Sequence, residues 1–237
     1  GFNRGVFEWL RKAPWGNPAF SGMFLSLVMF GFIGGISGVI LGTEQLNVLM
    51  HNTIYVPGHF HGTVVAGTTL AFMAGTYLAL PLIFQRDIIW PSLARIQPYL
   101  FGIGAAGISV FMMGAGTLGV ARRHWDINFT DAVIGFQHSP GAFLMMGMNG
   151  ISAILAALGG IIFVLVVVGT ALFGKKIGPG HKMTFPLHSS AAVVSKYGSE
   201  GTIKLPGTIV LVTIFFLSFV LYYFVNWKYL SDLWLFR

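Results

Sequence analysis

Five long apolar stretches dominate this sequence, and none of them contains a Lys, Arg, Asp or Glu. Because the hydrocarbon core of a bilayer is about 30 Å thick, a helix that spans it needs about 20 apolar residues. Each stretch is about that long or longer and lacks the alternating pattern of β-barrel strands. The stretches cover roughly Phe20–Leu41, His59–Phe84, Pro98–Ala121, Gly141–Gly174 and Gly207–Val225. The sequence therefore predicts an all-α, polytopic transmembrane bundle with five spans.

The composition excludes both a soluble enzyme and a disordered chain. Only 9% of the residues are charged, whereas soluble domains carry about 25%. The hydrophobic share of 55% is the opposite of a disordered composition. Lys and Arg in cytoplasmic loops explain the net charge of +7, so this charge does not indicate nucleic-acid binding. The predicted partner is the lipid bilayer, and no nucleic acid is expected. The absence of cysteine excludes disulfides and thiolate metal sites.

Lys and Arg are distributed unequally between the two sides of the predicted bundle. Cytoplasmic loops of membrane proteins are enriched in these residues. Of the 14 present, all but four fall on the side of the N-terminus, the exceptions being Arg122, Arg123, Lys228 and Arg237. We therefore expect a cytoplasmic N-terminus, an outer C-terminus and a cytoplasmic loop at about 175–205. Residues 1–237 are expected to form a single membrane domain.

Glycines recur along two of the predicted spans, as Gly34 with Gly38 and as Gly102 with Gly107. Small residues allow the backbones of membrane helices to approach closely. We interpret these four glycines as helix-packing positions.

Two histidines, His59 and His61, lie at the start of the second predicted span. Burying an ionisable side chain in a membrane is costly, so such residues indicate a functional site. Pro57 and Gly58 precede them, and we expect the helix to begin just after this pair, since proline is tolerated at helix starts and glycine allows close backbone approach.

The spacing of the two histidines favours two separate cofactors over one shared metal ion. Residues two apart on a helix differ in direction by about 200°, so the imidazoles leave on nearly opposite sides, with Phe60 between them. Haem suits this geometry, because its iron takes an axial imidazole and its ring an apolar slot. The alternative is two hydrogen-bonded or hydrated polar residues at an interface.

Three cationic or polar residues are predicted on the same outer side as the two histidines. Arg122 and Arg123 follow the third span, and His51 lies in the preceding outer loop. Adjacent arginines can make charge-assisted hydrogen bonds to carboxylates such as haem propionates. The alternatives are arginines that reach lipid head groups and a solvated loop histidine.

Together these residues resemble a known family, the haem-copper oxygen reductases. The run from His51 to His61 resembles the tenth helix of their subunit I (cytochrome oxidase subunit I), and Arg122-Arg123 resembles the family's propionate-binding arginines. Val56-Pro57-Gly58 ahead of the histidines is similar to the B-type branch. The resemblance covers the chain as the C-terminal part of subunit I, helices nine to thirteen, and the predicted topology agrees with it.

The resemblance implies a role for each of these residues. His59 would be the axial ligand of the high-spin haem iron, where oxygen binds, and is the expected catalytic residue. His61 would be one of two axial ligands of the low-spin haem iron, with Phe60 between the two haems. The residues implied to hold the propionates are His51, Arg122 and Arg123.

The resemblance also implies that this chain acts with other protein segments. The histidines that bind the active-site copper belong to earlier helices of the family, so copper would be ligated by residues outside this chain. The implied partners are the N-terminal part of subunit I, subunit II, and cytochrome c or quinol as electron donor. The implied function is that of a multi-pass oxidoreductase of the prokaryotic inner (plasma) membrane, which reduces oxygen to water with proton translocation.

Two other interpretations fit the same residues. Nitric oxide reductase belongs to the same superfamily and has iron in place of copper. A non-catalytic membrane subunit or transporter bundle could carry the histidines as structural or pH-sensing groups.

Overall fold

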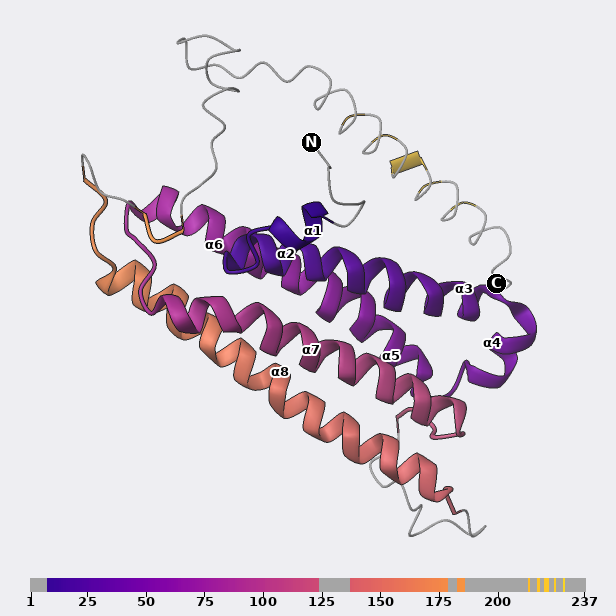
Figure 1. Cartoon of the computed structure of the whole chain (residues 1–237). Coiled ribbons are helices and arrows are strands. Elements are labelled where there is room, and N and C mark those ends of the chain that lie inside the picture. Colours follow the sequence, from indigo (N-terminus) through magenta and orange to yellow (C-terminus); the bar gives the residue numbers. More distant parts are fainter. Residues whose placement is uncertain are drawn as a thin grey trace. The chain divides into compact units, whose positions relative to one another are not determined.

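A computed structural model describes residues 8–123, 137–178 and 183–185, together with six single positions between 213 and 228. The chain divides into two units, Gly1–Leu187 and His188–Arg237. The first unit is a bundle of long helices (Figure 1). All six described positions of the second unit are helical, and the rest of the fifth predicted span lies outside the described residues.

The described helices of the first unit from α1 to α7 follow one another with short connections, and residues 118–139 join α7 to α8. They are α1 (Glu8–Lys12), α2 (Pro18–Val28), η1 (Met29–Gly35), α3 (Ile36–Gly42), α4 (Glu44–Met50), α5 (Tyr55–Phe60), η2 (His61–Thr69), α6 (Leu70–Phe84), α7 (Pro91–Thr117) and α8 (Pro140–Phe173). The segments η1 and η2 are π-helical turns inside longer helices.

Four continuous helices are long and apolar enough to cross a membrane. They are Pro18–Gly42, Tyr55–Phe84, Pro91–Thr117 and Pro140–Phe173. Four of the five predicted spans are therefore confirmed as helices, and the all-α fold class is confirmed.

Side-chain caps and prolines set the starts of two spans. The Asn17 side chain accepts a hydrogen bond from the N–H of Ala19 at 3.0 Å, and Pro18 follows as the first helical residue. Ser139 accepts from the N–H of Ala142 at 3.3 Å ahead of Pro140 in the same way. Such caps satisfy N–H groups that have no partner inside the helix, and proline at the first position loses no hydrogen bond.

Two predicted span starts are wrong. The third span begins at Pro91 instead of Pro98, because Trp90 has a left-handed backbone (φ 50°) and Pro91 starts the helix directly after it. The second span begins at Tyr55, so Pro57 and Gly58 lie within its first turn and not before it. Proline is tolerated at this third helical position because the first N–H groups of a helix have no internal partner.

Glycines allow the closest contacts between the spans, as predicted. A Cβ atom added at Gly34 would lie 2.6 Å from Thr63 Cγ2, and one at Gly107 would lie 2.9 Å from Ser152 Cβ. The latter contact belongs to the α7–α8 pair, which runs side by side in Figure 1. The predicted packing role of these glycines is confirmed, and it follows the rule for small residues in membrane helices.

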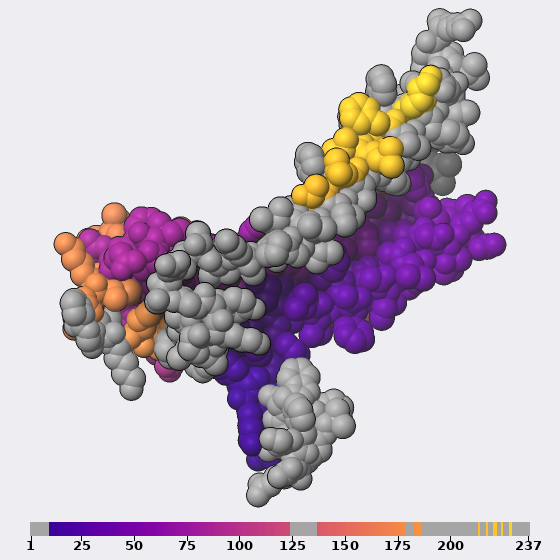
Figure 2. All heavy atoms as spheres, turned by 90° about the horizontal axis from the view of Figure 1, so that it is seen from above, coloured from indigo at the N-terminus to yellow at the C-terminus, as the bar shows by residue number. Residues whose placement is uncertain are grey.

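Large apolar side chains cover the outside of the described spans. Val39 is 73% exposed and Phe72 is also 73% exposed, on the two spans whose surface is coloured indigo to purple in Figure 2. A soluble protein rarely exposes so much contiguous apolar surface. These faces therefore fit contact with lipid or with further membrane helices.

Candidate functional site

His59 lies in the last turn of α5 and faces α3 of the neighbouring span. Its Nδ1 atom is 2.8 Å from the Ser37 hydroxyl oxygen. Gly38 leaves room for the ring, since a Cβ atom added there would lie 3.2 Å from His59 Cε1. The imidazole is half-buried, and its Nε2 atom has no hydrogen-bond partner among the described residues.

His61 is the first residue of η2 and bonds to its own helix. Its Nδ1 atom is 2.8 Å from the carbonyl oxygen of Pro57. A carbonyl oxygen can only accept a hydrogen bond, so Nδ1 carries the proton and the lone pair resides on Nε2. Within the described part of the chain, this Nε2 atom also has no partner. The two histidines thus have separate partners and separate free nitrogen atoms.

Phe60 separates the two histidines and is 55% exposed. Its ring centroid lies 5.5 Å from that of His59, with the ring planes tilted by 55°. An exposed phenyl group beside two histidines offers an apolar surface to a flat cofactor on either side.

The loop that carries His51 and the loop that carries the arginine pair are joined at their backbones. The N–H of Ile54 donates to the carbonyl of Val120 at 2.9 Å, and the N–H of Arg122 donates to the carbonyl of Asn52 at 3.0 Å. These two bonds flank an isolated antiparallel bridge. The structure therefore brings the predicted cationic residues to the same end of the spans as the start of α5.

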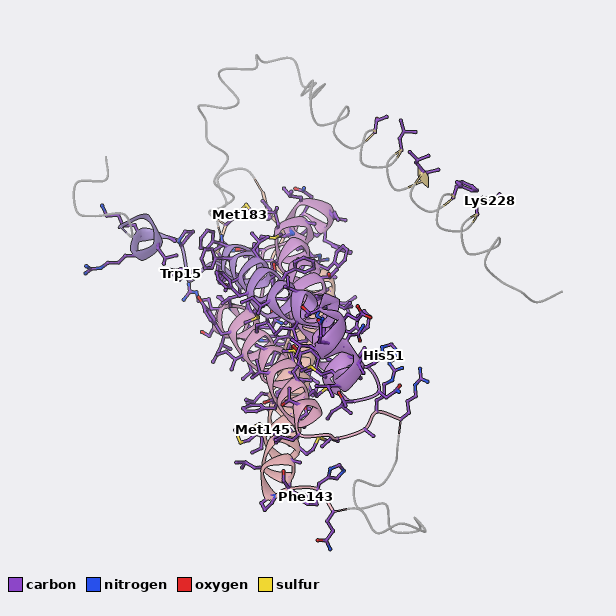
Figure 3. All side chains as sticks on the ribbon, turned by 90° about the vertical axis from the view of Figure 1, so that its right-hand side faces the viewer. Trp15, His51, Phe143, Met145, Met183 and Lys228 are labelled. Atoms are coloured by element: carbon purple, nitrogen blue, oxygen red, sulfur yellow. The ribbon has the colours of Figure 1, made fainter. Side chains whose placement is uncertain are left out.

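Arg122 is the member of this group with an unsatisfied polar atom. Its side chain is half-buried, and its Nε atom is buried without a hydrogen-bond partner among the described residues. A buried donor without an acceptor destabilises the fold, so the position fits an acceptor from another molecule, such as a carboxylate. Arg123 is exposed, with a left-handed backbone (φ 68°). His51 is also exposed and lies at the surface of the bundle in Figure 3.

Sequence reasoning missed three residues that shape this site. Ser37 contacts His59, as described above, and Ser109 of α7 donates to the carbonyl of Gly58 at 2.6 Å. Gly116 of α7 lies against the backbone of Tyr55, where a Cβ atom would meet Tyr55 Cα at 2.7 Å.

The residues present fit haem. Two imidazoles have Nδ1 engaged and Nε2 free, which is the arrangement that orients a metal-bound histidine. The buried Arg122 Nε atom suits a propionate. Within residues 8–123, 137–178 and 183–185, no group of three or more His, Cys, Asp or Glu side chains could hold a metal ion. The described part thus has two histidines that fit axial haem ligation, and it contains no cluster of three or more such side chains that could bind copper.

The fold and this site define a multi-pass helical membrane protein with histidines and arginines gathered at one end of its spans. Residues 3–150 match the family model described as Cytochrome C and Quinol oxidase polypeptide I. This match covers more than half of the chain, and the chain belongs to this family. The resemblance to subunit I is thereby confirmed, and with it the multi-pass membrane location.

Individual relatives agree with this assignment. Cytochrome c oxidase subunit 1 of Thermus thermophilus is 34% identical over 158 residues, which are 65% of this chain and 27% of the relative. Quinol oxidase subunit 1 of Bacillus subtilis (strain 168) is 28% identical over 148 residues, 59% of this chain and 22% of the relative. The chain therefore spans about a quarter of the length of these relatives.

A solved structure has the same fold. It is a cryo-EM structure of a heme-copper terminal oxidase dimer, and it matches with a TM-score of 0.64 and 28% sequence identity. The match covers 73% of this chain and 31% of that chain. The helical bundle described above is thus the fold of part of a haem-copper oxidase subunit.

Proposed function

We propose that this chain is the part of a terminal oxidase that supplies one axial ligand to each of two haems. The observation that carries the proposal is the state of the two histidines, each with Nδ1 engaged and Nε2 free. In this proposal His59 would be the axial ligand of the high-spin haem, and His61 would be one of two axial ligands of the low-spin haem. When bound, the haems and copper supply the redox chemistry that reduces oxygen to water, coupled to electron transfer and proton translocation.

The side chains around these histidines hold the haems in place. Phe60, exposed between the two imidazoles, would lie between the two haems. Arg122 would donate to a propionate through its buried Nε atom, while Arg123 and His51 would complete the polar layer at the outer end. Fixed cations keep the propionates ionised and oriented, which is one of the means by which a protein tunes a haem.

The remaining parts of the oxidase come from other segments. The chain spans 27% of the Thermus thermophilus relative, so most of that relative's length lies outside the match. We propose that an N-terminal part of subunit I supplies the copper ligands and the second low-spin ligand. We propose subunit II as a further partner and cytochrome c or quinol as the electron donor. The cytoplasmic N-terminus, the outer C-terminus and the single membrane domain stay predictions.

A carbon monoxide difference spectrum of the purified complex tests this proposal. We expect a reduced-minus-oxidised haem spectrum in which only one of two haems responds to carbon monoxide, because the low-spin iron has both axial positions filled. A complex without a carbon-monoxide-reactive haem would overturn the proposal and favour a non-catalytic membrane subunit.

Replacing Arg122 by glutamine should weaken haem retention more than the same change at Arg123. The reason is burial: Arg122 has a buried Nε atom, whereas Arg123 is exposed to solvent screening. Hydrogen bonds to charged groups contribute about 1.5–3 kcal/mol, so we expect about a tenfold or larger effect on haem dissociation for Arg122→Gln. The measurement is the haem-to-protein ratio after dilution and washing, and equal losses in both variants would contradict the assignment.

A further inference from the structure

Ser37 is a buried hydroxyl that links the first span to His59. Its side chain is 3% exposed, and its Oγ atom lies 2.8 Å from His59 Nδ1. Among the described residues, Ser37 is the one hydrogen-bond partner of His59 Nδ1. No other residue of the first span contacts either histidine through a described hydrogen bond.

The other contacts of Ser37 set the direction of this hydrogen bond. Its Oγ atom lies 2.5 Å from the carbonyl oxygen of Ile33 and 3.1 Å from that of Gly34. Both carbonyl oxygens can only accept, and a hydroxyl has a single proton to donate. A serine inside a helix commonly donates to the carbonyl four residues earlier, so this proton goes to Ile33. A lone pair of Ser37 is therefore left for His59, whose Nδ1–H donates to it.

This direction determines the form of the imidazole. A neutral histidine with its proton on Nδ1 has its lone pair on Nε2, which is the form that binds a metal. Gly38, next to Ser37, allows the ring to lie against α3, with 3.2 Å between His59 Cε1 and an added Cβ atom. The α3 segment thus fixes both the tautomer and the position of the ring.

We propose that Ser37 is a positioning residue for His59 that sets how strongly His59 Nε2 donates electrons to the high-spin haem iron. This inference rests on the proposed function, in which His59 is the axial ligand. Hydrogen bonds from a metal-bound histidine to a neighbouring acceptor raise the basicity of the ligand. The hydroxyl that donates to Ile33 is polarised by that bond and accepts more strongly from His59.

The test compares Ser37→Ala with the unaltered, complete oxidase by resonance Raman spectroscopy of the reduced, carbon-monoxide-free enzyme. Loss of the acceptor should move the iron–histidine stretching band of the high-spin haem to lower wavenumber and raise the midpoint potential of that haem. The low-spin haem bands should stay unchanged, because His61 bonds to Pro57 instead. Ser37→Thr keeps a hydroxyl at the position and should return the band toward its original wavenumber.

Ser26→Ala is the matched control. Ser26 is 2% exposed on the same first span, and its hydroxyl donates to the carbonyl of Met23 at 2.8 Å without contacting a histidine. The Ser26→Ala variant should leave the iron–histidine band and the midpoint potential of the high-spin haem unchanged. An unshifted band and potential in Ser37→Ala, or an equal shift in Ser26→Ala, would overturn this inference. Absence of an iron–histidine band from the unaltered oxidase would instead overturn the proposed function.

Discussion

Replacing His59 with alanine is expected to abolish carbon monoxide binding while the low-spin haem signal persists. His59 Nε2 has no hydrogen-bond partner among the described residues, and its ring lies against Gly38 of α3. If His59 is the axial ligand of the high-spin haem, as proposed, its loss removes that bond, and we expect complete loss of the carbon monoxide response. The measurement is the reduced spectrum of the purified complex with and without carbon monoxide.

His61→Ala is the reciprocal variant and the matched control. The two histidines have separate partners, Ser37 for one and Pro57 for the other, so their effects should separate as well. We expect His61→Ala to abolish the low-spin signal and to leave carbon monoxide binding in place. Equal loss of both signals in each variant would contradict the separate assignments, and retention of both signals in both variants would contradict the haem site itself.

The spans could be predicted from the sequence because length and apolarity decide them. Two of the span starts could not be predicted, because they depend on single backbone positions and on tertiary burial. Arg95 and Gln97 look like loop residues in sequence, yet both lie inside α7. Gln97 is fully buried, with its amide nitrogen 3.4 Å from Met73 Sδ. These charged and polar residues interrupt the apolar run in the sequence, so the predicted start of the third span lies seven residues after the observed one.

The candidate site was predicted only in part, because some of its contacts join residues that are far apart in the sequence. His59, His61 and Arg122 stand out in sequence because charged and polar residues are so few. Ser37 does not stand out, since its contact with His59 joins residues 22 positions apart. Pattern reasoning also treated the second span as a regular α-helix, whereas η2 begins at His61. Short π-helical segments occur often at functional sites, but no periodicity in the sequence indicated this one.

Gly116→Ala is expected to loosen the outer end of the site. A Cβ atom at this position would lie 2.7 Å from both Tyr55 Cα and Tyr55 Cβ, and the backbone there cannot yield without moving the start of α5. Overpacking of this kind costs about 1–3 kcal/mol. The displacement would also strain the backbone bonds from Ile54 to Val120 and from Arg122 to Asn52. We therefore expect a lower Tm and a lower haem-to-protein ratio in the purified complex.

Gly75→Ala separates this effect from the general cost of adding a methyl group to a membrane helix. Gly75 lies in α6, and a Cβ atom there would meet no heavy atom within 4 Å. Since alanine favours helix more than glycine does, this variant should keep or slightly raise the Tm and keep the haem content. If Gly116→Ala matched Gly75→Ala in both measurements, the close contact between α7 and Tyr55 would not support the site. Because the Gly116 contact and the Arg122 backbone bond join the same two segments, a loss of haem in Gly116→Ala would show that this packing contact supports the haem site.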